Sequence, residues 1–415
     1  MPVAETRLCE SYAWDNEQFG MVFSSLTVMY AVGQFVNGQL ADRFGSRAVA
    51  SLGVLGSVAV NPAVFVLLFA CRRAGRIGSS CSRCWWSSGE CNGFFQSMGW
   101  SPMVKAMAHW YPLSRRGRIM GMWGTCYQFG GAFASLLALF LIGYAAQELG
   151  GDWRNVFLVP AVLLAAVGVF FYLEMRNRPE DVGLPAVDWE EVPAGDAWRE
   201  QPSIARNLVR TLSNPHLWIV AATFFMLDVN RYGFVNWMPS FLDARGMGQA
   251  SPLLADFKKA MTLCIHPLAG SAGAILAGWA IDRFFGGRRG PVIAMLLALL
   301  GLFSFVFPRV DPAHTGLVVL VVALVGMCTY GPHILMVGHA AQDFGKKSGA
   351  AGAAGFIDAV GYIGASLAGW WAGKLIDARG YEAAFAAFGL AAENIMALFA
   401  AYRTWGRYGF RLAHS

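Results

Sequence analysis

The chain has 415 residues, of which 56% are hydrophobic and only 14% are charged, and its formal net charge is +6. A soluble domain usually carries about a quarter charged residues, so this composition excludes an ordinary soluble domain. Apolar runs of about 20 residues recur along the whole chain and are long enough to cross a bilayer as helices. The arginines lie in short loops between these runs, which indicates basic membrane-facing loops and not nucleic-acid binding.

Apolar runs bounded by charged residues or by Gly and Pro predict an all-α polytopic membrane protein with about 11 spans. Five spans come first, near residues 20–40, 48–70, 88–111, 119–146 and 154–173. A polar stretch of roughly 40 residues follows, and its composition is typical of a linker. Six more spans come after it, near 215–242, 259–281, 291–307, 315–341, 350–376 and 381–404. We therefore divide the chain into a first transmembrane half (1–173), a linker (174–213) and a second half (214–415).

A repeated loop relates the two halves to each other. "GQLADRFGSR" (Gly38–Arg47) closes the first span, and "GWAIDRFFGGRR" (Gly278–Arg289) closes the second span after the linker. Halves of a transporter often repeat in this way, and the register predicts a six-plus-six architecture that lacks its first helix in this chain. In both loops an acid and arginines are placed to pair with neighbouring loops, which predicts a conformational latch. The latch residues are Gly38, Asp42, Arg43, Gly45, Arg47, Asp282 and Arg283.

Basic residues concentrate in alternate loops, and by the positive-inside rule these loops, the linker and the C-terminus face the cytoplasm. The segment Cys71–Glu90 breaks the pattern, because four arginines fall on the predicted outer side. We interpret it either as a local frameshift or as a genuine insertion. Its Cys81 and Cys84 form C-x-x-C, but no fourth ligand with metal-site spacing accompanies them, so we expect no metal.

Several sequence blocks resemble the major facilitator superfamily, and within it the organophosphate:phosphate antiporter family of bacterial glycerol-3-phosphate and hexose-phosphate transporters. They include "GWSPMVKAMAHWYPLSRRGRIMGMWGTCYQFGGA" (Gly99–Ala132), "RYGFVNWMPSFL" (Arg231–Leu242) and "YGPHILMVGHAAQDFGKKSGAAGAAGF" (Tyr330–Phe356). The resemblance covers most of the chain from about Phe19 onward. It implies a monomer in the cell inner (plasma) membrane that exchanges an organic phosphate, such as a sugar phosphate or glycerol 3-phosphate, for inorganic phosphate by alternating access.

Arg231 lies near the middle of an apolar run, where a charge costs several kcal/mol unless it faces a wet cavity or a partner. A guanidinium suits phosphate, because it is always charged and presents a planar fork of donors. The resemblance implies the same role, since the family's second-half phosphate-binding arginine falls on this R-Y-G. We expect the side chain to face a central aqueous cavity between the halves. The alternative is an ion pair with Asp228, one helical turn earlier.

Tyr30, Tyr330 and Tyr362 fall where the resemblance implies cavity-lining tyrosines, whose hydroxyls can donate to phosphate or sugar oxygens. Ordinary packing is the alternative for each of them. Gln34 stands where the glycerol-phosphate transporter has a lysine, and Tyr127 where it has a histidine. These departures place glycerol 3-phosphate itself in doubt and favour another phosphorylated compound. Lys105 is either a further substrate contact or a buried charge partner.

Asp228 and Asp358 add two carboxylates in apolar surroundings, where a raised pKa would let them carry protons. The sequence therefore also permits a proton-coupled symporter of organic anions. A third alternative is a transporter-like sensor of sugar phosphates, which the resemblance includes. An enzyme is excluded by the lack of a P-loop, a metal cluster or a serine nucleophile elbow, and no cofactor is expected.

Overall fold

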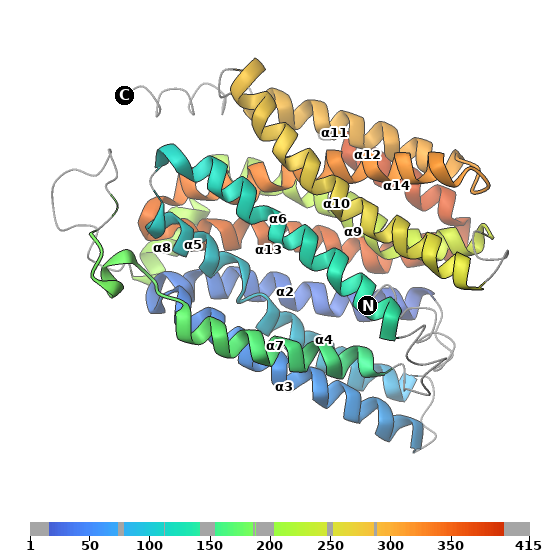
Figure 1. The fold of residues 1–415 in the computed structure, drawn as a ribbon, viewed down its shortest axis with the longest axis horizontal. Helices are drawn as coiled ribbons and strands as arrows, with labels where there is room; N and C mark the ends of the chain where they lie inside the picture. Colours follow the sequence, from blue (N-terminus) through green and yellow to red (C-terminus); the bar gives the residue numbers. More distant parts are fainter. Residues whose placement is uncertain are drawn as a thin grey trace.

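The computed structural model describes residues 16–73, 79–111, 113–141, 154–185, 187, 203–246, 252–285 and 289–393. Over these ranges the chain is helical, without a strand. The longer helices run side by side along the long axis of the molecule (Figure 1). The predicted all-α fold is therefore confirmed.

A first group of helices precedes the linker. It contains α2 (Asn16–Phe44), α3 (Ser46–Arg73), α4 (Ser79–Gln96), α5 (Trp100–Trp110), α6 (Leu113–Phe140) and α7 (Asn155–Glu174). Within it α3 packs against α4 and α7, and α2 packs against α4. Helix α4 begins inside the arginine-rich segment 71–90, although the side chains of residues 68–87 lie outside the described set.

The predicted span 88–111 is two helices and not one. A turn over residues 97–99 separates α4 from α5. Ser97 donates its hydroxyl to the Phe94 carbonyl at 2.6 Å, which competes with the backbone ladder at the end of α4. Pro102 sits in the first turn of α5, where a residue without an N–H is tolerated but could not continue an earlier helix.

The described part of the predicted linker contains two short helices, η3 (Pro179–Val182) and α8 (Ile204–Leu212). The hydroxyl of Ser203 caps α8 by accepting a hydrogen bond from the Arg206 amide at 3.3 Å, the usual role of serine at this position. The second group follows, with α9 (Pro215–Ala244), α10 (Pro252–Phe284), α11 (Arg289–Val306), η5 (Phe307–Arg309), α12 (Thr315–Ile334), the π-helical η6 (Leu335–Ala340), α13 (Ala341–Arg379) and α14 (Tyr381–Glu393).

The two groups meet along an antiparallel seam between α2 and α13. Glycines bring the backbones close: a Cβ on Gly38 would lie 2.6 Å from the Ala351 carbonyl oxygen, and one on Gly20 would lie 2.6 Å from that of Gly369. Small residues permit this close approach in membranes. A second contact joins α6 to α10. The central part of the molecule is thus built from helices of both groups.

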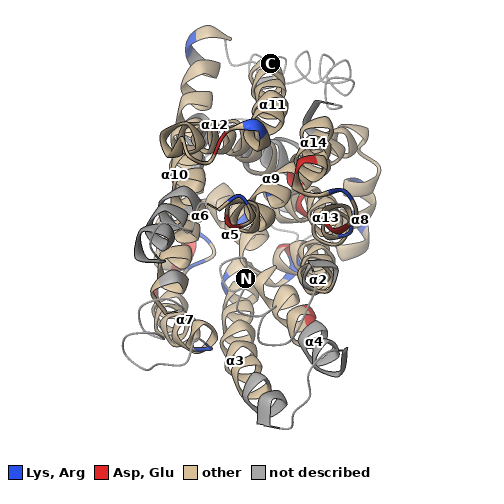
Figure 2. Cartoon of the chain, turned by 90° about the vertical axis from the view of Figure 1, so that its right-hand side faces the viewer, with Lys and Arg blue, Asp and Glu red and all other residues tan. Residues whose placement is uncertain are grey.

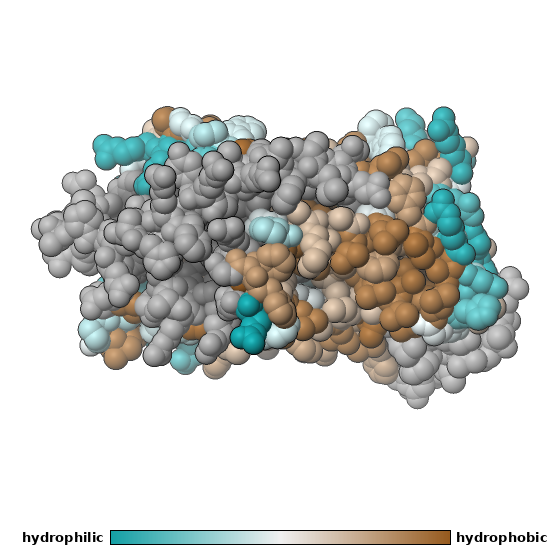
Figure 3. Space-filling view, turned by 90° about the horizontal axis from the view of Figure 1, so that it is seen from above, coloured by the Kyte–Doolittle hydropathy of each residue, from teal (hydrophilic) through white to brown (hydrophobic). Residues whose placement is uncertain are grey.

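The outside of the bundle suits lipid. By length and composition alone, six described segments could cross a membrane: Ser46–Leu67, Asn155–Glu174, Cys264–Ile281, Gly290–Arg309, Thr315–Val337 and Gly349–Arg379. Viewed along the helix axes, most of the helical ribbon carries no charge (Figure 2). The surface seen from above has an apolar area bounded at one end by hydrophilic residues (Figure 3). Both views agree with a molecule that spans a bilayer.

Helices α2 and α9 are long enough to span but are not among these six, because polar residues interrupt them. In α9 the polar side chains of Asp228, Asn230, Arg231 and Asn236 are all buried. Such residues are expensive against lipid and therefore face the inside of a bundle. The polar positions of α9 mark the interior of the molecule, where the candidate site lies.

Three predictions about the chain ends and loops lie wholly or partly outside the described residues. The prediction that a first helix is absent depends on residues 1–15, which the structure does not describe. The last predicted span continues past α14 into residues 394–404, which are also outside the described set. The side chain of Asp282 is also outside the described set.

Candidate substrate-binding site

Arg231 on α9 lies where helices of both groups meet. Its Nη1 donates to Asp228 Oδ1 at 3.2 Å, and its Nη2 donates to the hydroxyl of Tyr127 on α6. The guanidinium carbon also lies 4.8 Å from the ring centre of Tyr232 and 5.3 Å from that of Tyr330 on α12. The arginine thus contacts the first group as well as its own, and it does not face lipid.

The side chain of Arg231 is only 2% exposed, so the expected exposure to an aqueous cavity is wrong for this conformation. The physical reason is that one carboxylate and three aromatic rings cover the guanidinium. Attraction between a cation and aromatic faces is strong where water is excluded. The ion pair with Asp228, which the sequence offered as the alternative, is therefore present in this structure.

A second polar cluster joins α2 to α13 beside the arginine. Tyr30 and Tyr362 have ring centres 4.2 Å apart, and the Tyr232 hydroxyl donates to that of Tyr362 at 2.9 Å. Gln34 donates to the Tyr30 hydroxyl at 3.0 Å and accepts from Ser101 of α5. The hydrogen bonds lie within each group, and the ring contact between Tyr30 and Tyr362 links the two groups.

The structure therefore brings together most of the predicted substrate contacts. Arg231, Tyr127, Tyr330, Tyr362, Tyr30 and Gln34 form one connected set through the contacts given above. Tyr127 is the most open member, at 39% exposed. Ligand binding by these residues remains a prediction.

Both predicted carboxylates are buried near the arginine. Asp228 is fully buried, and its Oδ2 has no hydrogen-bond partner among the described residues. Asp358 on α13 is also buried, within electrostatic range of Asp228 and Arg231. Two carboxylates around one guanidinium leave the site without net positive charge when both are ionised.

Lys105 on α5 lies away from Arg231, beside the end of α2. Its ammonium donates to the carbonyls of Ala41 and Asp42 at 2.9 Å each and pairs with Asp42 Oδ1 at 3.5 Å. It is therefore a buried charge partner in this structure, and its described contacts do not include the Arg231 cluster.

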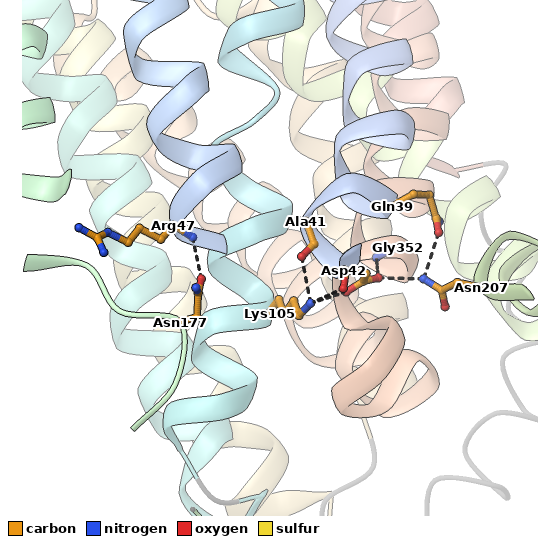
Figure 4. Close-up of polar contacts among 8 residues, drawn as sticks. All are labelled: Gln39, Ala41, Asp42, Arg47, Lys105, Asn177, Asn207 and Gly352. Carbon is orange, nitrogen blue, oxygen red and sulfur yellow. Dashed lines mark hydrogen bonds and ion pairs between the residues drawn. The ribbon is translucent and has the colours of Figure 1, made fainter. Parts of the chain in front are cut away.

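Asp42 forms the centre of a contact between α2, α8 and α13 (Figure 4). Its Oδ2 accepts hydrogen bonds from the Gly352 amide of α13 and from Asn207 of α8, both at 2.9 Å. Asn207 also donates to Gln39 at 3.0 Å. One carboxylate thus joins the first group, the linker and the second group, which is the arrangement that a latch requires. Its charge partner is Lys105, which corrects the expectation of a loop arginine.

Two of the other predicted latch residues, Gly45 and Arg47, hold the α2–α3 turn. Gly45 has a φ of 90°, which favours glycine because it has no Cβ. Arg47 donates through its amide to Asn177 at 2.8 Å (Figure 4) and through its side chain to the Tyr172 carbonyl at 2.8 Å, so it ties α3 to the end of α7. Arg43 and Arg283 are exposed.

Sequence reasoning missed two buried histidines close to Arg231, His266 on α10 and His333 on α12. It also missed Asn207 and Gln39, which lie in the contact around Asp42. The histidines carried the same signal as Arg231, an ionisable residue in an apolar run. Asn207 carried none, because its partners are 165 and 168 residues away along the chain.

A sequence model of the Major Facilitator Superfamily matches residues 1–369. The chain therefore belongs to this superfamily, whose members are multi-pass membrane transporters and not enzymes.

Its relatives agree with the expected resemblance. A probable hexose phosphate transport protein of Chlamydia pneumoniae is 28% identical over 417 residues, which cover 94% of this chain and 84% of the relative. The glycerol-3-phosphate transporter of Bacillus subtilis (strain 168) is 29% identical over 373 residues, covering 86% and 77%. The crystal structure of the human organic anion transporter MFSD10 superposes with a TM-score of 0.64 at 16% identity, over 92% of this chain and 83% of that one. The resemblance to the organophosphate:phosphate antiporter family is thereby confirmed, and the solved structure supports the fold.

Proposed function

We propose that the chain is a secondary active transporter that moves an organic phosphate, a sugar phosphate or a compound like glycerol 3-phosphate, in exchange for inorganic phosphate. The observation that carries the proposal is the buried guanidinium of Arg231, in contact with α6 of the first group and α12 of the second. A fixed cation between two groups of helices can hold an anion while either side of the molecule opens. Two relatives named for hexose phosphate and glycerol 3-phosphate transport support the same class of ligand.

The proposal includes the arrangement in the membrane. Residues 1–173 form the first half, 174–213 a cytoplasmic linker and 214–415 the second half, in a monomer of the inner (plasma) membrane. The latch around Asp42 then lies at the cytoplasmic end of α2, where the positive-inside rule places the linker. Breaking the hydrogen bonds from Asp42 to Gly352 and Asn207 would accompany opening of that side.

Exchange by purified protein in vesicles tests the function. Protein reconstituted into phosphate-loaded proteoliposomes should take up labelled phosphate and release the internal pool one for one. Arg231→Lys keeps the charge but loses the planar fork. We expect it to lower exchange by about tenfold or more, because the substrate loses roughly one charge-assisted hydrogen bond. Arg309→Lys, at an exposed arginine of η5, is the matched control and should exchange like the wild type.

The outcome separates the alternatives. Binding of phosphate without any accumulation would favour a sensor over a transporter. Equal exchange by wild type and Arg231→Lys would remove Arg231 from the site.

A second candidate function, proton-coupled symport of an organic anion, is favoured by one observation. Asp228 and Asp358 are both buried close to a single arginine, and a buried carboxylate without a full partner readily takes up a proton. Uptake driven by an inward proton gradient into vesicles without internal phosphate would support symport. Uptake that requires internal phosphate would support exchange.

A further inference from the structure

The guanidinium of Arg231 and two imidazole rings lie around one tyrosine ring, that of Tyr330. The ring of Tyr330 has its centre 5.6 Å from that of His266 and 6.0 Å from that of His333. The guanidinium carbon lies 5.3 Å from the centre of this tyrosine ring. Side chains from three helices, α9, α10 and α12, thus lie around the ring of Tyr330.

Each of these side chains has a nitrogen without a hydrogen-bond partner among the described residues. They are Nε2 of His266, Nδ1 of His333 and Nε of Arg231. The two histidines are only 2% and 7% exposed. A buried polar atom left unpaired costs free energy, and proteins seldom retain several of them in one place without a use. Phe or Leu would fill the same volume at a lower cost, so the imidazoles indicate a polar ligand.

We propose that His266 and His333 are anion-binding residues, which hold the phosphoryl group of the ligand together with Arg231. This inference rests on the proposed function, because it takes the ligand to be an organic or inorganic phosphate. A phosphoryl group presents three terminal oxygens. The guanidinium fork can bind two of them, and an imidazole N–H can donate to the third, since the proton of a neutral imidazole can occupy either nitrogen.

The geometry also determines which anions fit. A carboxylate has two oxygens in one plane, and Arg231 alone can satisfy both of them. The histidines would then stay unpaired and buried, so a carboxylate leaves part of the burial cost in place. A tetrahedral phosphoryl group satisfies donors that approach from three helices. The histidines thus select phosphate over carboxylate.

The surroundings of His333 supply the matched variants for a test. Its ring lies 6.1 Å from the ring centre of Tyr127, in a stacked arrangement, and 5.2 Å from that of Phe224. His333→Phe keeps these aromatic contacts and removes the donor. His333→Gln keeps an N–H donor and removes the ring. The same two substitutions apply to His266, and His314→Phe, at an exposed histidine beside Asp311, is the control.

The experiment measures the affinity of the purified full chain for inorganic phosphate by titration calorimetry. We expect both Phe variants to bind about tenfold or more weakly, because each loses one hydrogen bond to a charged group. The affinity of the Gln variants should stay within about threefold of the wild type, and that of His314→Phe should be unchanged. The Gln variants and the control all keep every donor to the phosphate. Phe variants that bind like the wild type, or Gln variants as weak as the Phe variants, would overturn the proposal.

A spectroscopic measurement covers the case in which a variant does not fold. In wild-type protein labelled with 15N in the histidine rings, phosphate should shift the signals of His266 and His333 and leave His314 unchanged. Unshifted signals under saturating phosphate would overturn the proposal. Loss of binding in Arg231→Lys with normal binding in the histidine variants would contradict this inference alone. A wild-type chain that binds no phosphate would instead contradict the proposed function.

Discussion

The pairing of Asp228 with Arg231 determines what the candidate site is without a ligand. Both side chains are almost completely buried, and Nη1 of the arginine lies 3.2 Å from the carboxylate. A buried ion pair is weak evidence for stability, but removal of one partner leaves an uncompensated charge. The carboxylate thus substitutes for the anion that the guanidinium is proposed to bind.

Asp228→Asn should therefore destabilise the protein by about 3–5 kcal/mol, because Arg231 loses its buried counter-ion. Phosphate should restore more stability to this variant than to the wild type, since a ligand that binds only the folded state stabilises it more when it binds more tightly. Thermal unfolding in detergent with and without phosphate measures both effects.

Asp311→Asn is the control for the loss of a carboxylate. Asp311 is an exposed aspartate whose neighbour His314 is also exposed, and surface pairs contribute about 0–1 kcal/mol. If Asp228→Asn unfolds at the wild-type temperature and gains nothing extra from phosphate, the carboxylate is not the counter-ion of the guanidinium.

The sequence predicted the residues of the site better than their partners. Arg231 and Asp228 were found because a charge inside an apolar run is expensive. Tyr127 was found only through the resemblance, and its contact with Arg231 joins residues 104 positions apart. Such a contact depends on how α6 and α9 pack, which no local pattern encodes.

At the scale of elements, the helix bounds follow hydropathy closely. The predicted spans 154–173 and 215–242 correspond to α7 (Asn155–Glu174) and α9 (Pro215–Ala244). The prediction failed at the break between α4 and α5, where Ser97, Gly99 and Pro102 end one helix and begin another within a single apolar run. Hydropathy averages over such a run and cannot register a turn inside it.

The repeated loops also differ at this scale, although their sequences agree. Gly38 and Gly278 open the two copies of the same motif. A Cβ on Gly38 would lie 2.6 Å from the Ala351 carbonyl oxygen, whereas one on Gly278 would meet nothing within 4 Å. Only the first copy therefore lies in the seam between α2 and α13.

Gly38→Ala should destabilise the protein by about 1–3 kcal/mol, because the added methyl group forces two backbones apart. Gly278→Ala should have little effect or a small stabilising one, since alanine favours helix at an open position. Thermal unfolding of the two variants makes the comparison. Equal unfolding temperatures would show that the seam is not closely packed at Gly38.

At the scale of the whole molecule, the seam between α2 and α13 runs from Gly20 to Gly38, and polar contacts close both of its ends. Asp42 and Gly352 meet at one end. At the other end, Ser24 donates to the Ser366 carbonyl at 2.7 Å and accepts from the Trp370 amide at 2.9 Å. Alternating access requires one end of such a seam to open while the other stays closed.

A cross-link across the end that contains Ser24 should therefore stop exchange. In a background with the native cysteines replaced by serine, Ser24→Cys and Ser366→Cys would be treated with a short bis-methanethiosulfonate. This reagent forms a disulfide with each thiol, releases sulfinate as the leaving group, and would tie α2 to α13. We expect phosphate exchange in proteoliposomes to fall by about tenfold or more, because rocking of the two halves is blocked, and to recover when the linkage is reduced.

Val54→Cys with Gly168→Cys is the control, because a Cβ on Gly168 would lie 2.4 Å from Val54 and both helices belong to the first group. That pair should cross-link without loss of exchange. Full exchange by the Ser24–Ser366 cross-linked protein would mean that the seam does not open at this end, and that the proposed rocking of the two halves is wrong.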